Sequence, residues 1–178
     1  MKRFFYMLIM ATMAITMLES CLGDDVADEY KDWREANEAW YQQQASSGEY
    51  TVVTASWDPS AQVLMKWHND RSLTSSNLSP LITSTADVKY HGKLYDNTPF
   101  DSSYLVTSPA DSIYRSVVSQ NIEGWMIALT HMRVGDSCTV IMPYAQAYGS
   151  SSQGNVVKPY SDLVFDLKLV NIYKYKAN

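Results

Sequence analysis

Residues 119–135 read SQNIEGWMIALTHMRVG and contain the clearest periodic pattern of the chain. Large apolar residues recur there at helical spacing and share one face, namely Ile122, Trp125, Met126, Leu129 and Met132. Ser119 is placed to cap the amino-terminal end, and Gly135 follows the carboxy-terminal end. The sequence therefore predicts one helix over Ser119 to Met132.

Strand-like segments precede and follow this predicted helix in the sequence. They are rich in β-branched and aromatic residues and are separated by turn-forming pairs such as Asp58-Pro59. The predicted strands lie within Tyr50 to Ser56, Ala61 to His68, Thr83 to Leu94, Ser137 to Met142, and Leu163 to Tyr173. This order predicts an α+β domain in which one helix packs on a face of an antiparallel sheet.

A second helical pattern covers residues 28–44. Its aromatic residues Tyr30, Trp33, Trp40 and Tyr41 follow one helical stripe between polar residues. Two interpretations stay open at this point. The stripe docks onto the chain's own domain, or it forms a partner-binding face through which residues 28–44 join two chains in a homodimer.

The first twenty residues have the layout of a secretory signal. Lys2 and Arg3 precede an apolar run that is shorter than the roughly 20 residues of a membrane-spanning helix. The following Leu18-Glu19-Ser20-Cys21 resembles a bacterial lipobox, which implies cleavage before Cys21 and acylation of Cys21. Because Glu19 departs from the small residue usual there, a plain cleaved signal and a permanent anchor helix stay open as alternatives.

The residues that follow Cys21 bear on where the protein is located in the cell. Gly23-Asp24-Asp25 is an acidic start similar to the export tag of surface lipoproteins in some Gram-negative bacteria. We therefore expect a bacterial outer-membrane lipoprotein that is periplasmic or surface-exposed. With Cys21 acylated, only Cys138 remains, and its strand-like surroundings predict a buried, unreactive thiol.

Composition excludes several classes of function. The chain has 14 Lys and Arg against 19 Asp and Glu, a net charge of −5, which argues against a nucleic-acid partner. The 3 histidines are scattered without ligand spacing, so we expect no metal site. No phosphate-binding loop or nucleophile motif occurs in the sequence, and the acidic residues look dispersed over solvated faces.

Five short segments between Ala86 and Tyr173 resemble, in their order and spacing, the FKBP-type peptidyl-prolyl cis-trans isomerases. They are Val88–Gly92, Phe100–Ser103, Ile122–Trp125, Ala147–Gly149 and Leu163–Leu167. The resemblance implies an FKBP-like antiparallel sheet of five or six strands wrapped around one helix. Together with the signal layout, the lipobox and the helical stripe, it divides the chain into a lipoprotein signal peptide (1–20), an acidic tether with an amphipathic helix (21–48) and an isomerase domain (49–178).

The resemblance also implies a catalytic pocket. Its aromatic walls and floor would be Tyr90, Phe100, Trp125 and Phe165. The backbone N–H of Ile122 would meet a substrate carbonyl, and the polar groups at the pocket edge would be Asp101 and Tyr148.

Further residues are expected to bind substrate around this pocket. Val156 and Val157 would form the apolar tip of an overhanging loop, and Asn121 would make the rim more polar than is usual in the family. For a further aromatic wall two alternatives stay open: Tyr114 supplies it, or the pocket lacks it.

These features predict a peptidyl-prolyl cis-trans isomerase that assists the folding of proline-containing exported polypeptides and needs no cofactor. Such a pocket needs no nucleophile, because an apolar cavity favours a twisted amide over the planar, hydrated one. Asn121 and the uncertain wall favour an alternative, a non-catalytic chaperone or peptide-binding lipoprotein of the same fold. A glycan-binding lipoprotein is a third hypothesis, based on Trp and Tyr side chains that could stack on sugars.

Overall fold

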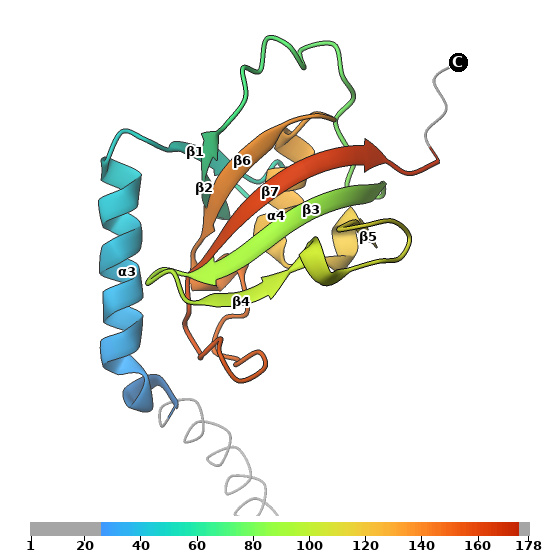
Figure 1. The fold of residues 1–178 in the computed structure, drawn as a ribbon. Coiled ribbons are helices and arrows are strands. Elements are labelled where there is room, and N and C mark those ends of the chain that lie inside the picture. The colour runs from blue at the N-terminus through green and yellow to red at the C-terminus, as the bar shows by residue number, and fades with distance from the viewer. Residues whose placement is uncertain (1–25, 175–178) are drawn as a thin grey trace, which may run out of the picture.

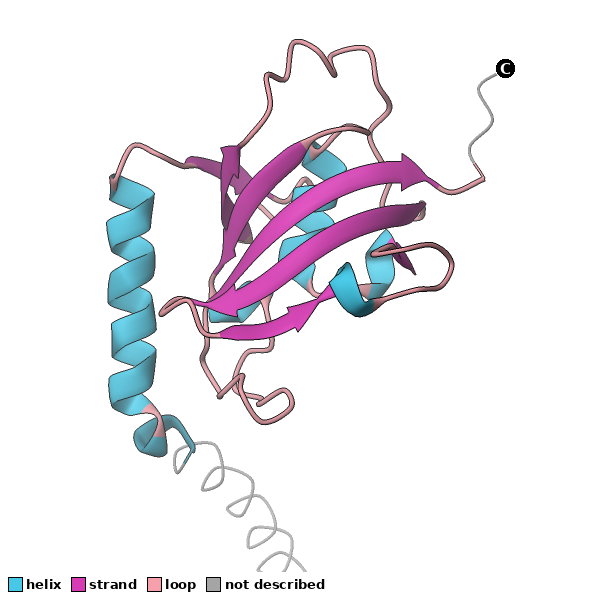
Figure 2. Cartoon of the chain, in the orientation of Figure 1, coloured by secondary structure: helices cyan, strands magenta, loops and turns pink. Residues whose placement is uncertain are grey.

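The computed structural model describes residues 26–174, which are drawn in Figures 1 and 2. Within this range one sheet holds seven strands, and they are β1 (Thr51–Thr54), β2 (Gln62–Trp67), β3 (Thr85–Leu94), β4 (Pro99–Ser102), β5 (Tyr114–Val117), β6 (Ser137–Met142) and β7 (Leu163–Ile172). The helices that frame the sheet are α3 (Lys31–Ser46) and α4 (Glu123–His131).

All neighbouring strands are antiparallel, in the order β1-β2-β6-β7-β3-β4, with β5 also paired to β3. This confirms the expected α+β fold, an antiparallel sheet that packs around one helix. The strands that the sequence pattern missed are β4 and β5, which bring the described sheet to seven strands. Each has four residues, too few for an alternation of apolar and polar side chains to be recognised.

Helix α4 supplies the centre of the core. Figure 1 shows it behind the central strands, on one face of the sheet. Its residues Ile127, Ala128 and Leu129 are completely buried, and they pack in one cluster with side chains of β2, β3, β6 and β7. Full burial of a Leu or Ile side chain stabilises the fold by about 1.5–3 kcal/mol, so this face anchors α4 firmly.

The expected start of α4 was wrong. The helix begins at Glu123, and Ser119 lies instead in a 3₁₀ turn that follows β5. The side-chain amide of Asn121 donates hydrogen bonds to the carbonyl oxygens of Val117 (2.9 Å) and Val118 (3.2 Å). Because this side chain bonds to the preceding backbone, the turn is held closed and the helix starts only after it.

Helix α3 packs against the chain's own domain, at one end of the sheet in Figure 2. Tyr41 is buried among side chains of β2, β6 and β7, and the rings of Trp33 and Trp40 lie 5.1 and 5.9 Å from the ring of Tyr95. The interpretation in which the stripe docks onto its own domain is therefore confirmed. A homodimer through residues 28–44 would have to use the opposite side of the helix.

Three carboxylates are buried, which contradicts the expectation that the acidic residues lie on solvated faces. They are Asp87, Asp136 and Asp162. Asp87 on β3 accepts two hydrogen bonds from Arg115 on β5, from Nε at 2.6 Å and from Nη2 at 2.9 Å. Asp87 and Arg115 lie far apart in the sequence, so no local sequence pattern predicts that they pair.

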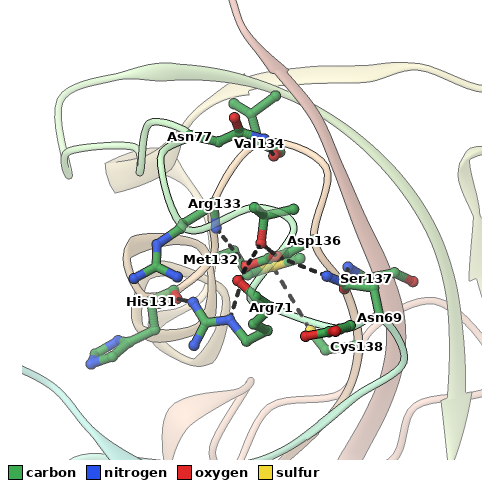
Figure 3. Close-up of polar contacts among 12 residues, drawn as sticks. Asn69, Arg71, Asn77, His131, Met132, Arg133, Val134, Asp136, Ser137 and Cys138 are labelled. Carbon is green, nitrogen blue, oxygen red and sulfur yellow. Dashed lines mark hydrogen bonds and ion pairs between the residues drawn. The ribbon is translucent and has the colours of Figure 1, made fainter.

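Asp136 is 0 % exposed and lies between α4 and β6 (Figure 3). Its carboxylate accepts hydrogen bonds from Asn69 Nδ2 (3.1 Å), Arg71 Nε (3.2 Å), Thr74 Oγ1 (2.6 Å) and Arg133 N (2.8 Å). Burial raises the pKa of Asp136, but these hydrogen bonds and the Arg71 charge outweigh burial and lower the pKa below 3.8. The cluster ties the long loop after β2 to the start of β6.

Asp162 is 1 % exposed and lies just before β7. Its Oδ1 accepts the backbone N–H of Tyr144 at 2.8 Å, whereas no hydrogen-bond donor among residues 26–174 reaches its Oδ2. Burial, with a smaller contribution from the charge of Glu38, raises the pKa of Asp162 to about 7. This carboxyl therefore changes its charge near neutral pH.

The expected signal peptide and Cys21 lie outside the described residues. Across residues 26–174, no helix has both the length and the apolar character needed to cross a membrane. Cys138 is free and buried, so the prediction of a buried thiol is confirmed; burial also raises the pKa of this thiol.

Candidate functional site

An aromatic pocket of about 220 Å³ lies between the sheet and the amino-terminal end of α4. Its lining residues are Tyr90, Asp101, Tyr114, Gln120, Asn121, Ile122, Trp125, Tyr148 and Phe165. The structure thus brings together eight of the residues that the sequence placed in or around the site, and it adds Gln120. Tyr114 does line the pocket, so the further aromatic wall is present.

Trp125 forms the floor of this aromatic pocket. It comes from the first turn of α4, and its ring meets three others nearly edge-on. The ring centroids lie 5.0 Å away for Tyr90, 5.3 Å for Phe165 and 6.0 Å for Tyr114, with interplanar angles between 84° and 88°. Edge-to-face contacts of this kind fix the rings in place and leave an apolar surface toward the opening.

Phe100 stands beside the aromatic pocket and does not line it. Its ring packs on Phe165, with centroids 5.5 Å apart, and it borders an outer hollow described below. Both rings lie against Gly92 of β3, where an added Cβ would come within 2.8 Å of Phe165 and 2.9 Å of Phe100. Only glycine leaves room for the two rings here, so Gly92 belongs to the construction of the site.

A hydrogen-bonded pair marks the polar edge of the pocket. The Tyr90 hydroxyl donates to Asp101 Oδ2 at 2.7 Å, and the backbone N–H of Ser102 donates to Asp101 Oδ1 at 2.7 Å. Burial and the hydrogen bond to Asp101 raise the pKa of Tyr90. Burial and the nearby Asp101 charge likewise raise the pKa of Tyr148, so both phenols stay protonated at neutral pH.

Two donors of lining residues have no protein acceptor in the described part of the chain. They are the hydroxyl of Tyr148 and the backbone N–H of Ile122. Ile122 is the residue just before α4, where helix N–H groups are free and the helix dipole favours an acceptor. Each donor is available to hold a carbonyl oxygen of a bound peptide.

Asn121 and Gln120 make up the rim next to Ile122. The Asn121 amide nitrogen is occupied by Val117, Val118 and the hydroxyl of Ser116. Asn121 therefore shapes the turn that presents Ile122 and does not direct its donor group into the opening. The sequence reading missed Gln120, because its position on the rim depends on this turn.

Val156 and Val157 lie on the loop of residues 149–157, which we name the rim loop. Together with Phe100, Asp101 and Tyr148 the rim loop encloses an outer hollow of about 210 Å³. Val156 is 36 % exposed, as an overhanging tip requires, but Val157 is 3 % exposed and packs into the core. The expectation that both form an exposed tip was wrong for Val157.

No three His, Cys, Asp or Glu side chains among residues 26–174 gather as a metal site would require.

Comparison with known proteins agrees with this geometry. The family model described as "FKBP-type peptidyl-prolyl cis-trans isomerase" matches residues 78–170, just over half of the chain. The "Macrophage infectivity potentiator" of Trypanosoma cruzi is 39 % identical over 98 residues, which cover 55 % of this chain and 48 % of that protein. The "Outer membrane protein MIP" of Legionella longbeachae is 37 % identical over 92 residues, or 52 % of this chain and 38 % of that protein.

Solved structures share the fold. A peptidyl-prolyl cis-trans isomerase from Pseudomonas syringae superposes with a TM-score of 0.66 at 22 % identity, covering 80 % of this chain and 95 % of that one. FkpA from Escherichia coli superposes with a TM-score of 0.67 at 21 % identity, covering 88 % of this chain and 67 % of that one. The matched region spans less than half the length of each of the two curated relatives named above. The chain belongs to the FKBP-type peptidyl-prolyl cis-trans isomerase family.

Proposed function

We propose that the chain is a peptidyl-prolyl cis-trans isomerase that acts on proline-containing polypeptides. One observation carries the proposal: an aromatic pocket whose lining residues include two donors without an acceptor among residues 26–174, the Tyr148 hydroxyl and the Ile122 N–H. Rotation about a peptide bond faces a barrier of about 18–20 kcal/mol, because resonance gives the C–N bond partial double-bond character. Uncatalysed Xaa-Pro isomerisation therefore takes tens of seconds.

The pocket lowers this barrier without covalent chemistry. A twisted amide has lost its resonance and much of its dipole, so the rings around Trp125 accept it more readily than the planar, hydrated amide. The Ile122 N–H and the Tyr148 hydroxyl hold carbonyl oxygens that flank the proline, which fixes the ring while the bond rotates. Asp101 fixes the Tyr90 ring through its hydrogen bond, and the reaction needs no cofactor.

Removing the Phe100 ring, which supports the pocket wall formed by Phe165, or removing one donor of the pocket should slow the reaction. We expect Phe100→Ala to reduce kcat/KM for a short Xaa-Pro peptide about tenfold, and Tyr148→Phe about fivefold, the equivalent of one hydrogen bond of about 1 kcal/mol. A protease-coupled assay measures both. Tyr104→Phe is the matched control, because Tyr104 is exposed and lines neither the aromatic pocket nor the outer hollow. Unchanged activity in both pocket variants would refute the assignment of the pocket.

The alternative of a non-catalytic chaperone or peptide-binding module keeps the same pocket. Two features favoured it in the sequence, the polar Asn121 and the uncertain wall at Tyr114. The amide nitrogen of Asn121 is bound to the backbone of the turn, and Tyr114 lines the pocket. Neither feature therefore still favours the non-catalytic alternative. Client binding by a chain without isomerase activity would establish the alternative.

We also propose that the chain is a bacterial outer-membrane lipoprotein, periplasmic or surface-exposed, whose clients are exported proteins. The lipobox-like Leu18-Glu19-Ser20-Cys21 supports this location, and so does the printed name of the Legionella longbeachae relative, "Outer membrane protein MIP". The division into residues 1–20, 21–48 and 49–178 belongs to the same proposal. The family match begins only at residue 78, although β1 and β2 already contribute to the sheet.

The lipid anchor has a direct test. We expect Cys21→Ala to release the protein from the membrane fraction, because the thiol that would carry the acyl chains is lost. Immunoblots of membrane and soluble fractions measure this, with Cys138→Ala as the matched control, since Cys138 is buried in the core. A Cys21→Ala variant that stays in the membrane fraction rules out the anchor at Cys21.

A further inference from the structure

Helix α3 is in contact with the segment that follows the rim loop. Residues 158–162, which we name the hinge segment, connect the rim loop to β7. In Figure 1 the amino-terminal end of α3 lies next to this part of the chain. The family match does not include α3, so these contacts are a feature of this chain that the match does not explain.

Two hydrogen bonds join α3 to the hinge segment. The indole Nε1 of Trp33 donates to the hydroxyl of Ser161 at 3.1 Å. The backbone N–H of Asp162 donates to the side-chain oxygen of Asn37 at 2.8 Å. Asn37 is 0 % exposed, and its amide nitrogen is bound to the carbonyl oxygen of Trp33, so its orientation is fixed within α3.

Two cation–π contacts add to these bonds. The Lys158 ammonium lies 4.7 Å from the centroid of the Trp33 ring, and the Arg34 guanidinium lies 5.4 Å from the centroid of the Tyr160 ring. Four of the five residues of the hinge segment are thus held by α3. A short stretch that is held at almost every residue has little freedom to shift.

Residues 150–156 of the rim loop have few ties to the rest of the domain, whereas Val157 packs into the core. Residues 150–156 are all exposed, and within the rim loop the backbones of Gln153 and Val157 bond to each other at 2.9 and 3.2 Å. Its base is closed by the hinge segment, because the backbone N–H of Tyr160 donates to the carbonyl oxygen of Gly149 at 2.8 Å. The position of the hinge segment therefore contributes to where the exposed part of the rim loop lies.

The rim loop is one wall of the outer hollow, which shares Asp101 and Tyr148 with the aromatic pocket. We propose that α3 positions the substrate site: Trp33 and Asn37 hold the hinge segment, and through it they set the rim loop over the pocket. Trp33 and Asn37 are positioning residues and have no contact with the bound proline. The part of this proposal that concerns turnover rests on the proposed isomerase function, whereas the part that concerns the rim loop does not.

Hydrogen exchange, measured by mass spectrometry on the full chain, tests the structural part. We expect the hydrogen-bonded amides of Gln153, Val157 and Tyr160 to exchange at least fivefold faster in Trp33→Ala than in the parent chain. Trp33→Phe keeps a ring beneath Lys158 but loses the bond to Ser161, so we expect a smaller increase. This milder variant also decides the question if Trp33→Ala does not fold.

Trp40→Ala is the matched control. Trp40 lies on the same helix and packs on Tyr95, as Trp33 also does, but it makes no polar or cation–π contact with the hinge segment. We expect Trp40→Ala to leave exchange in residues 149–160 unchanged. Equal exchange in the parent chain and both Trp33 variants, or an equal increase in Trp40→Ala, would overturn the proposal.

Kinetics on an Xaa-Pro peptide test the functional part. We expect Trp33→Ala to raise KM about threefold to tenfold with kcat within twofold of the parent, because the rim loop contacts the bound chain and not the rotating bond. A merely structural loss would lower the active fraction and hence kcat. If the parent chain shows no isomerase activity, the proposed function fails, while the exchange experiment still decides whether α3 positions the rim loop.

Discussion

Asp136→Asn should destabilise the fold by about 3–5 kcal/mol, the usual cost of removing one partner from a buried charge pair. Both carboxylate oxygens of Asp136 accept two hydrogen bonds each, and all four donors remain in the variant. An amide offers one acceptor oxygen, so its NH₂ group must face Arg71 and the Arg133 N–H, or else Asn69 and Thr74. In either orientation buried donors are left without an acceptor.

Chemical denaturation measures this loss, and Asp111→Asn is the matched control because Asp111 is exposed. The pKa of Asp136 is lowered in the folded chain, so its contribution is fully present above the ordinary value of 3.8 and is lost as the pH falls below that value. The difference between parent and variant should therefore shrink in acid. A variant as stable as Asp111→Asn at pH 7 would show that the cluster does not hold the loop.

Asp162→Asn should have the opposite effect on the free energy of unfolding and raise it at pH 8 by about 2 kcal/mol. Folding raises the pKa of Asp162 from 3.8 to about 7, so the folded chain keeps a proton that the unfolded chain has released. The free energy of unfolding therefore falls as the pH rises from about 4 to about 7. Above that range the buried carboxylate is ionised and continues to destabilise the fold. Asparagine carries no charge and still accepts the Tyr144 N–H, and the cost of burying its NH₂ group at the place of Oδ2 keeps the gain at about 2 kcal/mol.

Unfolding curves at pH 5 and pH 8 measure this effect, again with Asp111→Asn as the control. At pH 5 the parent carboxyl is largely protonated in the folded chain, so we expect the stabilisation to be much smaller than at pH 8. A loss of stability at pH 8, or a difference that does not change with pH, would show that Asp162 is not the buried, uncompensated acid described above.

The main elements of the fold follow from local patterns in the sequence. The helical spacing around Trp125 and the long strands that contain Tyr90 and Phe165 are regular enough to be recognised without any tertiary information. The aromatic stripe of Trp33, Trp40 and Tyr41 predicted a helix as well, but only the structure shows which surface the stripe covers.

Other features depend on contacts that no local pattern reports. Asn121 ends the turn before α4 because its side chain reaches the backbone of Val117, and this moved the helix start away from Ser119. The buried carboxylates of Asp136 and Asp162 looked like ordinary surface acids, because most of the partners of Asp136 lie far away in sequence and Asp162 Oδ2 has no donor among residues 26–174. Segments such as Phe100–Ser103 were predicted through the family resemblance, and periodicity alone would not have found them.

The most direct test of the proposed function is a protease-coupled isomerisation assay on a short Xaa-Pro peptide, with the parent chain and Asp101→Ala side by side. Asp101 accepts a hydrogen bond from the Tyr90 hydroxyl at 2.7 Å and lines the aromatic pocket. Without this carboxylate the Tyr90 ring loses the bond that holds it in the pocket wall. We predict that the parent chain accelerates isomerisation and that Asp101→Ala loses most of this acceleration. A well-folded parent chain that gives no acceleration would contradict the isomerase function.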